Sequence, residues 1–187
     1  MLEKPIALSL KEVDEMISAS KGDHVKLCVV HNKLFEPVMI KARARVREGS
    51  IGDLVGIDIK ELSRSDSRLL VNKDHWCHKL PGGVFNETIP HSIYLTAAFL
   101  GHLAPVAVQS RNFSSYEWVV ADGIRIILEG RKGLGAITYG SSSPKDKVII
   151  DVYGTIKNLR IDLWNSLMTE YGTSTMSHPS RALENLS

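Results

Sequence analysis

The chain has 187 residues, of which 43% are hydrophobic and 24% are charged, a composition typical of a folded globular protein rather than a disordered chain. The net charge of +2 is too small to indicate a nucleic-acid partner. No run of about 18 apolar residues indicates a membrane-spanning helix, and the charged N-terminal segment lacks the apolar centre of a signal peptide. Two cysteines, Cys28 and Cys77, form no disulfide framework, so we expect a reducing, cytoplasmic location.

The first third of the chain predicts two helices with a short strand between them. A Ser-x-x-Glu capping box at Ser9 predicts a helix over residues 9–20. Residues 25–30 are mostly apolar and β-branched, which favours a short buried strand. Pro37 suits the first turn of a second helix, and Gly49 suits its end.

The middle of the chain predicts a strand, a loop and a helix. Residues 54–61 read as a strand, and residues 62–75 read as a polar loop rich in Ser, Asp and Arg. A helix is expected over residues 90–100, with Gly101 as its stop.

The remainder of the chain predicts a sheet. Four apolar, β-branched runs predict strands over residues 106–108, 116–120, 124–128 and 147–153. Weaker strand signals lie at residues 136–139 and 155–159. Asp122-Gly123 favours a tight hairpin and Gly154-Thr155 another reversal, and short connections imply antiparallel pairing. The glycine-rich segment 129–135 is predicted to be a hairpin loop rather than a phosphate cradle, because strands flank it on both sides. We therefore predict an α+β fold with a large, open, mainly antiparallel sheet and helices covering one face.

The segment over residues 81–91 (PGGVFNETIPH) carries the pattern closest to catalytic chemistry. Glu87 and His91 are four residues apart, so on a helix they share one face. A carboxylate bonded to one ring nitrogen would fix the histidine tautomer and leave the other nitrogen to exchange a proton with a substrate. On spacing alone, a surface pair that simply satisfies itself, without catalytic function, is the more common interpretation of these two residues.

A metal site is the second chemical possibility. His75, Cys77 and His78 form the densest group of metal-ligating side chains in the sequence. Structural zinc requires two such pairs, and no second pair follows at suitable spacing. We therefore predict that the chain holds no metal ion.

Several short motifs stand in an order that resembles one oxidoreductase family. They are Glu3-Lys4-Pro5, the stretch HNKLFEP over residues 31–37, the turn Gly49-Ser50-Ile51-Gly52, Trp76, and Gly82-Gly83 with His91 after it. The glucose-fructose oxidoreductase / inositol dehydrogenase / MocA family shows EKP, N-x-x-F-x-P, G-x-I-G, a tryptophan and GG-x-x-x-D-x-G-x-H in this order.

The resemblance implies that the chain is the second of two family domains. Family members join a Rossmann domain, which ends at EKP, to a C-terminal domain with an open sheet like that of dihydrodipicolinate reductase. Residues 1–8 would then be a hinge segment, 9–170 the substrate-binding and oligomerisation domain, and 171–187 a loose tail. We expect NAD or NADP only in a full-length protein that includes the Rossmann domain, and no cofactor in this chain alone. A homodimer or homotetramer through the sheet face is also expected.

The resemblance also implies roles for individual residues. By position, the family's nicotinamide-facing lysine is Lys4, with Pro5 beside it in the cofactor-binding motif. The acid/base histidine is His91, and the aspartate four residues before it is Glu87. Substrate contacts are expected from four other positions of the chain: His31, Asn32, Trp76 and Asn86. The implied function is NAD(P)-dependent oxidation of a sugar, polyol or related hydroxy compound, with the isolated chain inactive.

Four residues depart from the family pattern. Ile89 replaces a glycine, Tyr94 replaces a frequent aspartate, Leu34 stands where arginine is common, and Pro90 is atypical. These departures favour the alternative that the chain is a noncatalytic binding or scaffold domain with the same fold.

Overall fold

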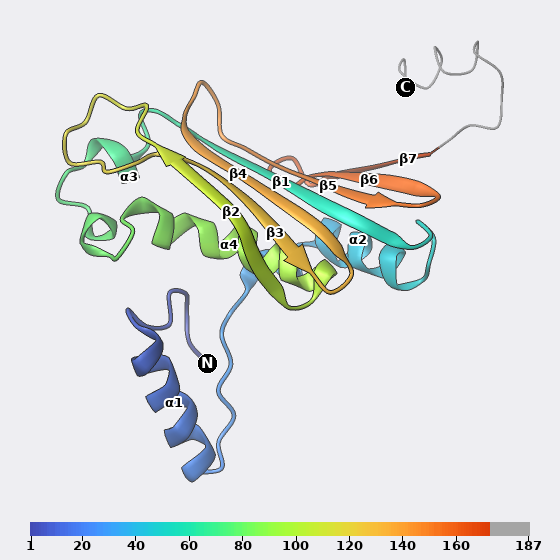
Figure 1. The fold of residues 1–187 in the computed structure, drawn as a ribbon, viewed down its shortest axis with the longest axis horizontal. Helices are drawn as coiled ribbons and strands as arrows, with labels where there is room; N and C mark the ends of the chain where they lie inside the picture. The colour runs from blue at the N-terminus through green and yellow to red at the C-terminus, as the bar shows by residue number, and fades with distance from the viewer. Residues whose placement is uncertain (173–187) are drawn as a thin grey trace.

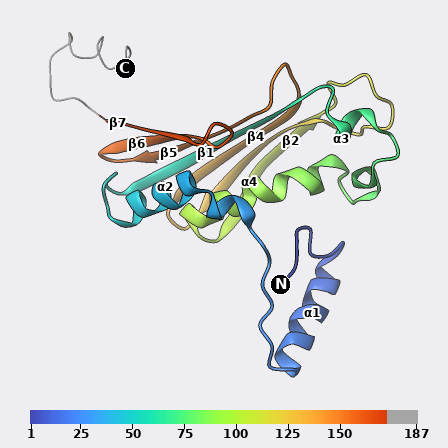
Figure 2. The ribbon, with the colours of Figure 1, turned by 180° about the vertical axis from the view of Figure 1, so that it is seen from behind.

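One mixed β-sheet forms the main body of the molecule (Figures 1 and 2). The computed structural model describes residues 1–172, and seven strands in this part of the chain form a sheet of order β2-β3-β4-β1-β5-β6-β7. The strands are β1 (Leu54–Arg64), β2 (Leu103–Arg111), β3 (Gly123–Gly130), β4 (Gly133–Ser143), β5 (Lys147–Gly154), β6 (Lys157–Asp162) and β7 (Leu167–Gly172). Strand β1 pairs in parallel with β4, and every other pairing is antiparallel.

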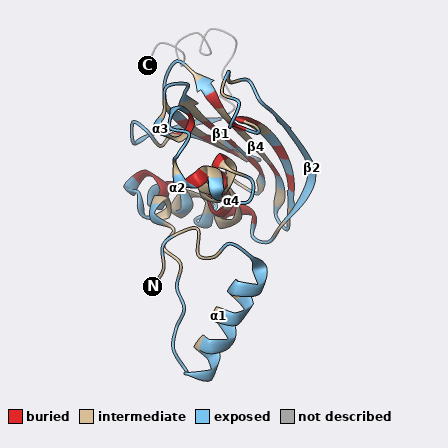
Figure 3. Cartoon of the chain, turned by 90° about the vertical axis from the view of Figure 1, so that its left-hand side faces the viewer, coloured by how far each residue is buried: buried red, intermediate tan, exposed pale blue. Residues whose placement is uncertain are grey.

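Two helices, α2 and α4, lie against one face of this sheet, and the opposite face carries no helix among the described residues (Figure 3). The helical elements are α1 (Leu10–Gly22), α2 (Pro37–Arg47), α3 (Arg68–Val71) and α4 (Val84–Leu100), with 3₁₀ turns η1 (Asn32–Phe35) and η2 (Trp76–Lys79). None of the helices in residues 1–172 has both the length and the apolarity needed to cross a bilayer.

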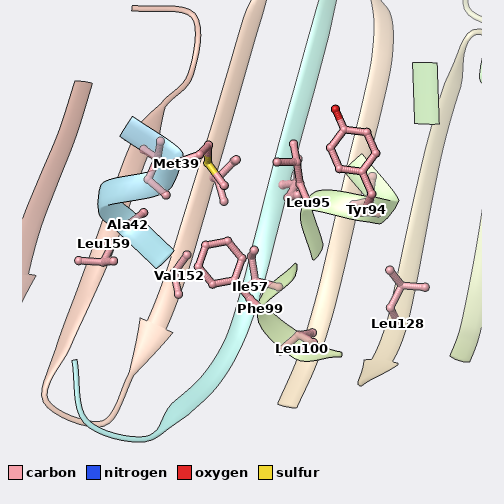
Figure 4. Close-up of a cluster of buried hydrophobic side chains, with 14 of the residues drawn as sticks. Met39, Ala42, Ile57, Tyr94, Leu95, Phe99, Leu100, Leu128, Val152 and Leu159 are labelled. Carbon is pink, nitrogen blue, oxygen red and sulfur yellow. The ribbon is translucent and has the colours of Figure 1, made fainter. Parts of the chain in front are cut away.

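The core lies between the helices and the inner face of the sheet (Figure 4). Alternate residues of the strands point inward, so Ile57 and Ile59 of β1 are fully buried against α4. Gly130 allows the end of α4 to pack closely, because a Cβ there would lie only 2.5 Å from the Cβ of Leu100.

The outer face of the sheet is mixed in character. Ile127 and Leu134 are exposed on it, but charged side chains occupy its centre. Arg160 Nε lies 2.7 Å from Asp151 Oδ1, and the Tyr153 hydroxyl donates to Asp58 at 3.0 Å. The open sheet predicted from the sequence leaves this face uncovered, and the face is not uniformly apolar.

Residues 1–30 form a separate unit below the sheet, in which helix α1 joins two extended segments (Figure 1). The Leu2 N–H donates to the carbonyl of Cys28 at 2.8 Å, and the Val30 N–H donates to the carbonyl of Leu2 at 2.8 Å. These bonds make a parallel bridge between Leu2 and Val29, with α1 as the connection. Helix α1 contains no buried residue.

Most predicted helices and strands are confirmed, including the capping box at Ser9, the second helix from Pro37 and the hairpin after Gly130. The strand expected over 25–30 is reduced to the single bridge at Val29, because only one extended segment is available to pair with it. Helix α4 begins at Val84 rather than 90, since Pro90 removes only one helical N–H while the packed face continues.

Other predictions for the sheet region are wrong. Residues 116–120 form no strand, and no hairpin forms at Asp122-Gly123. The Asp122 carboxylate instead accepts hydrogen bonds from the Phe113 N–H and the Ser142 hydroxyl, which fixes the long loop between β2 and β3. The predicted loop over 62–75 contains the end of β1 and the short helix α3, and β7 was not predicted. Most of the predicted loose tail lies outside the described residues.

Truncating a core side chain of the central strand should destabilise the fold. Replacing Ile59 by Ala removes a side chain that is 1% exposed between α4 and the sheet, so the free energy of unfolding should fall by about 2–5 kcal/mol. Ile127→Ala, on the outer face, is the matched control and should lower the free energy of unfolding by clearly less. Urea unfolding of the two variants measures the difference, and equal losses would contradict this assignment of the two faces.

Candidate active site

The start of α4 places the two residues of the predicted catalytic pair. Gly82 and Gly83 have φ values of +79° and +59°, a backbone conformation that side chains other than glycine rarely adopt. The chain therefore turns sharply into α4, and Glu87 and His91 follow one turn apart in its first half.

Lys4 reaches α4 from the N-terminal segment. Its ammonium lies 2.8 Å from Oε1 of Glu87 and also donates to the main-chain carbonyl of Glu87. The two side chains are 13% and 23% exposed. Oε2 of Glu87 is buried and has no partner among the described residues. The expected bond between Glu87 and the ring of His91 is absent among the described residues: Oε1 of the carboxylate pairs with Lys4, and the ring is bonded to another residue.

His91 is instead bonded to Tyr94. Nδ1 of His91 lies 2.8 Å from the Tyr94 hydroxyl, which is also 3.1 Å from Oδ1 of Asn32. The ring of His31 stacks on Tyr94, with centroids 4.4 Å apart. Two residues expected to bind substrate, His31 and Asn32, are therefore joined to the candidate acid/base through Tyr94.

The surroundings of His91 and Tyr94 keep both side chains uncharged at neutral pH. Burial first, and then the neighbouring cations of Lys33 and Lys4, lower the pKa of His91 to about 3. Burial raises the pKa of Tyr94 to about 12. At neutral pH, His91 is a neutral imidazole with one nitrogen free to accept a proton.

A second buried network lies behind this group and was not predicted. Glu61 of β1 is 8% exposed. Its Oε1 lies 3.4 Å from the ammonium of Lys33, and its Oε2 accepts a hydrogen bond from the Ser92 hydroxyl at 2.8 Å. Sequence analysis missed Glu61 because it sits in a strand pattern, where its alternation with Ile57 and Ile59 is the only signal of an inward position.

An open cleft of about 560 Å³ runs along this part of α4. Its polar wall includes Lys4, His31, Asn86 and Tyr94. The rest of the wall is mostly apolar and is formed by Pro81, Phe85, Ile89, Pro90, Ile93 and Ile124. His91 lies beside the cleft, between Pro90 and Tyr94 in α4, rather than in its wall. A small molecule in this cleft would contact an ammonium, an amide and three aromatic rings, those of His31, Phe85 and Tyr94.

Two other residues predicted for the site, Trp76 and Pro5, do not line the cleft. Trp76 is 49% exposed on η2, with its ring centroid 5.6 Å from that of His75, and it is not part of the cleft wall. Pro5 follows Lys4 and is partly buried.

The group of His75, Cys77 and His78, considered above as a metal site, does not form one in the described residues. Nδ1 of His75 accepts the N–H of Cys77, and residues 1–172 contain no group of three potential metal ligands.

The low pKa of His91 predicts a dependence of stability on pH. Unfolded histidine titrates near 6.5, so between pH 6.5 and about 3 the unfolded chain binds more protons than the folded one. The free energy of unfolding should therefore fall as the pH is lowered through this range.

The measurement is urea unfolding of the wild type and of His91→Gln at several pH values from 7 to 4. The wild type should lose more stability than the variant as the pH is lowered. One fully shifted proton would change the equilibrium constant of unfolding tenfold per pH unit, and we expect a smaller difference because His91 is only partly buried. Parallel pH curves for the two proteins would contradict the assignment.

No family model matches the chain. Oxidoreductase P35 of Formosa agariphila is 23% identical to it over 153 residues, which are 80% of this chain and 48% of P35. The chain spans about half the length of the curated relatives it matches.

Solved structures share the fold at low sequence identity. The WlbA dehydrogenase from Bordetella pertussis, in complex with NADH and UDP-GlcNAcA, matches 98% of this chain and 59% of its own, with a TM-score of 0.78 and 16% identity. Levoglucosan dehydrogenase, in complex with NADH and levoglucosan, matches 94% of this chain and 50% of its own, with a TM-score of 0.79 and 16% identity. The predicted α+β fold with an open sheet is confirmed, and it is the fold of part of these NADH-bound dehydrogenases.

Proposed function

We propose that this chain is the substrate-binding and oligomerisation domain of an NAD(P)-dependent oxidoreductase of the glucose-fructose oxidoreductase / inositol dehydrogenase / MocA type, acting on a sugar, polyol or related hydroxy compound. The observation that carries the proposal is the ion pair that fixes Lys4 to Glu87, one helical turn from His91. It holds the ammonium of Lys4, from a distant part of the sequence, in the cleft wall, and the imidazole of His91 lies beside the cleft on the next turn of α4.

These two groups suit the oxidation of an alcohol. The reaction removes a proton from the hydroxyl oxygen as a hydride leaves the carbon. The neutral imidazole of His91 accepts the proton, and the ammonium of Lys4 stabilises the negative charge that develops on the oxygen. Glu87 positions Lys4, while His31 and Asn86 in the wall hold the substrate.

The described residues fit only one end of a nicotinamide nucleotide. The open cleft beside Lys4 has room for a planar ring, which would accept the hydride when bound. The glycine-rich segment over 129–135 is a hairpin between β3 and β4, so it offers no strand-to-helix phosphate site. The nucleotide phosphates therefore require a Rossmann domain, and we expect the chain alone to be inactive.

Residues 1–30 support the proposal that a separate Rossmann domain binds the nucleotide. Two parallel segments joined by a helix are the repeating unit of parallel α/β sheets, which bury both faces. Within residues 1–172 this unit pairs with no further strand, and Val13, Met16 and Ile17 of α1 are exposed or only partly covered. We propose that this unit completes the missing Rossmann domain, which moves the domain boundary from residue 8 to about residue 30.

A reducing cytoplasm remains the proposed location. Cys28 is an exposed free thiol and Cys77 a buried one, and neither forms a disulfide.

The noncatalytic alternative also has an observation in its favour. Ile89 and Pro90, two of the departures from the family pattern, lie in the cleft wall and make it more apolar than a polyol site needs. A scaffold domain with this fold would bind a ligand in the cleft without transferring hydride.

Activity should appear when the missing half is supplied. The chain is fused behind a Rossmann domain and assayed for NADH or NADPH formation with a panel of sugars and polyols. Turnover should appear with some of these compounds, and His91→Ala should lower it by about 10²–10⁴-fold. Tyr116→Phe, in the loop between β2 and β3 and outside the cleft wall, is the control and should leave turnover unchanged. Nucleotide binding without turnover, or turnover unaffected by His91→Ala, would favour the scaffold alternative.

Association of the chain tests the oligomerisation role. The uncovered sheet face should pair copies of the chain into a dimer or tetramer, which light scattering after size-exclusion chromatography would show as a multiple of 20.7 kDa. Ile127→Asp, on that face, should shift the protein toward the monomer, whereas Leu10→Asp on α1 should not. A wild type that is monomeric at high concentration would remove this part of the proposal.

A further inference from the structure

The hydroxyl of Tyr94 has three polar neighbours from two different parts of the chain. Nδ1 of His91 lies at 2.8 Å, Oδ1 of Asn32 at 3.1 Å and the backbone nitrogen of Lys33 at 3.3 Å. Tyr94 is 8% exposed, so these neighbours rather than water decide where its single proton points.

The backbone N–H of Lys33 settles the orientation of the Asn32 amide. A backbone N–H can only donate, and it lies 2.8 Å from the Asn32 side chain, so the amide oxygen must face it. That oxygen also faces the Tyr94 hydroxyl. An amide oxygen can only accept, so Tyr94 donates its proton to Asn32.

The proton of Tyr94 is therefore unavailable to His91. The short contact between Tyr94 and Nδ1 can be a hydrogen bond only if Nδ1 carries a proton and donates it. We infer that Tyr94, oriented by Asn32, holds His91 as the Nδ1–H tautomer and leaves Nε2 with a lone pair that can accept a proton. This inference rests on the proposed function for its catalytic meaning, but the tautomer itself follows from the hydrogen bonds alone.

No other described group competes for the His91 ring. The cations that act on its pKa are Lys33 and Lys4, and an ammonium cannot accept a proton from Nδ1. The two carboxylates of the region pair with lysines, Glu87 through Oε1 with Lys4 and Glu61 with Lys33, and neither is hydrogen-bonded to the His91 ring. Nε2 has no hydrogen-bond partner within residues 1–172 and is not sealed from solvent.

Tyr94 thus performs the task that sequence analysis assigned to Glu87. In the proposed oxidation, Nε2 would take the hydroxyl proton of the substrate, and an oxidised nicotinamide nucleotide, when bound, would accept the hydride from carbon. His91 becomes an imidazolium that still donates through Nδ1 to Tyr94, so its ring need not turn. Tyr94 is a positioning residue, and its presence in place of an aspartate is compatible with catalysis.

The tautomer can be measured on the chain without any nucleotide. The protein is labelled with ¹⁵N-histidine, and long-range ¹H–¹⁵N correlation spectra are recorded at pH 7, with the His91 signals assigned by their loss in His91→Gln. Nδ1 of His91 should show the shift of a protonated ring nitrogen and Nε2 that of an unprotonated one. The reverse pattern would overturn the inference.

Variants of the two partners test the cause. Tyr94→Phe should release the constraint and move His91 toward a mixture of tautomers. Asn32→Ala should let Tyr94 donate to Nδ1 and favour the Nε2–H form, whereas Asn32→Asp, which keeps the acceptor, should preserve the wild-type pattern. Tyr153→Phe removes a distant hydroxyl and is the control. An unchanged His91 spectrum in Tyr94→Phe or Asn32→Ala would overturn the role of that residue.

The fused protein separates this inference from the proposed function. If it turns over substrate, Tyr94→Phe should lower kcat by about tenfold or more with little change in KM, short of the loss caused by His91→Ala. If it is inactive while the wild-type spectrum shows Nδ1–H, the proposed function fails and the tautomer assignment stands. A Tyr94→Phe enzyme with wild-type kcat would show that the fixed tautomer has no catalytic use.

Discussion

The ion pair between Lys4 and Glu87 is the contact on which the candidate active site depends. It ties an N-terminal segment that is otherwise remote from the sheet to the first turns of α4. Both side chains are mostly desolvated, so loss of either would leave the other charge in a poorly solvated place, which costs much more than breaking a surface pair. The pair therefore fixes where the N-terminal unit meets the sheet domain, and with it the position of the ammonium relative to His91.

A second constraint is the arrangement of charge around the imidazole. Two lysines lie near His91, and each of them has its own carboxylate, Glu87 or Glu61. The carboxylates are thereby occupied, and the ring bonds to an uncharged phenol. A carboxylate partner would raise the proton affinity of the ring; Tyr94 orients the ring without that effect. A proton taken up by this imidazole is weakly held and is readily passed on to solvent.

The elements with strong local signals could be predicted, and those fixed by distant contacts could not. The capping box at Ser9 and the β-branched run over 147–153 depend on neighbouring residues, and both form as expected. The pair of Lys4 with Glu87 depends on a contact between residues 83 positions apart, and spacing within α4 suggested His91 as the partner instead. Family resemblance brought Lys4, Glu87 and His91 to attention, but it treated Tyr94 only as a departure.

The position of β1 in the middle of the sheet has a consequence for how the protein is made. Gly56 of β1 pairs with Leu134, and Leu54 pairs with Gly154, so neither neighbour of this strand exists until most of the chain has left the ribosome. Closing such long loops is slow, and β1 has two unsatisfied edges in the meantime. During synthesis β1 therefore stays unpaired, and the apolar side chains of its inner face, which include Ile57 and Ile59, are exposed to association with other chains.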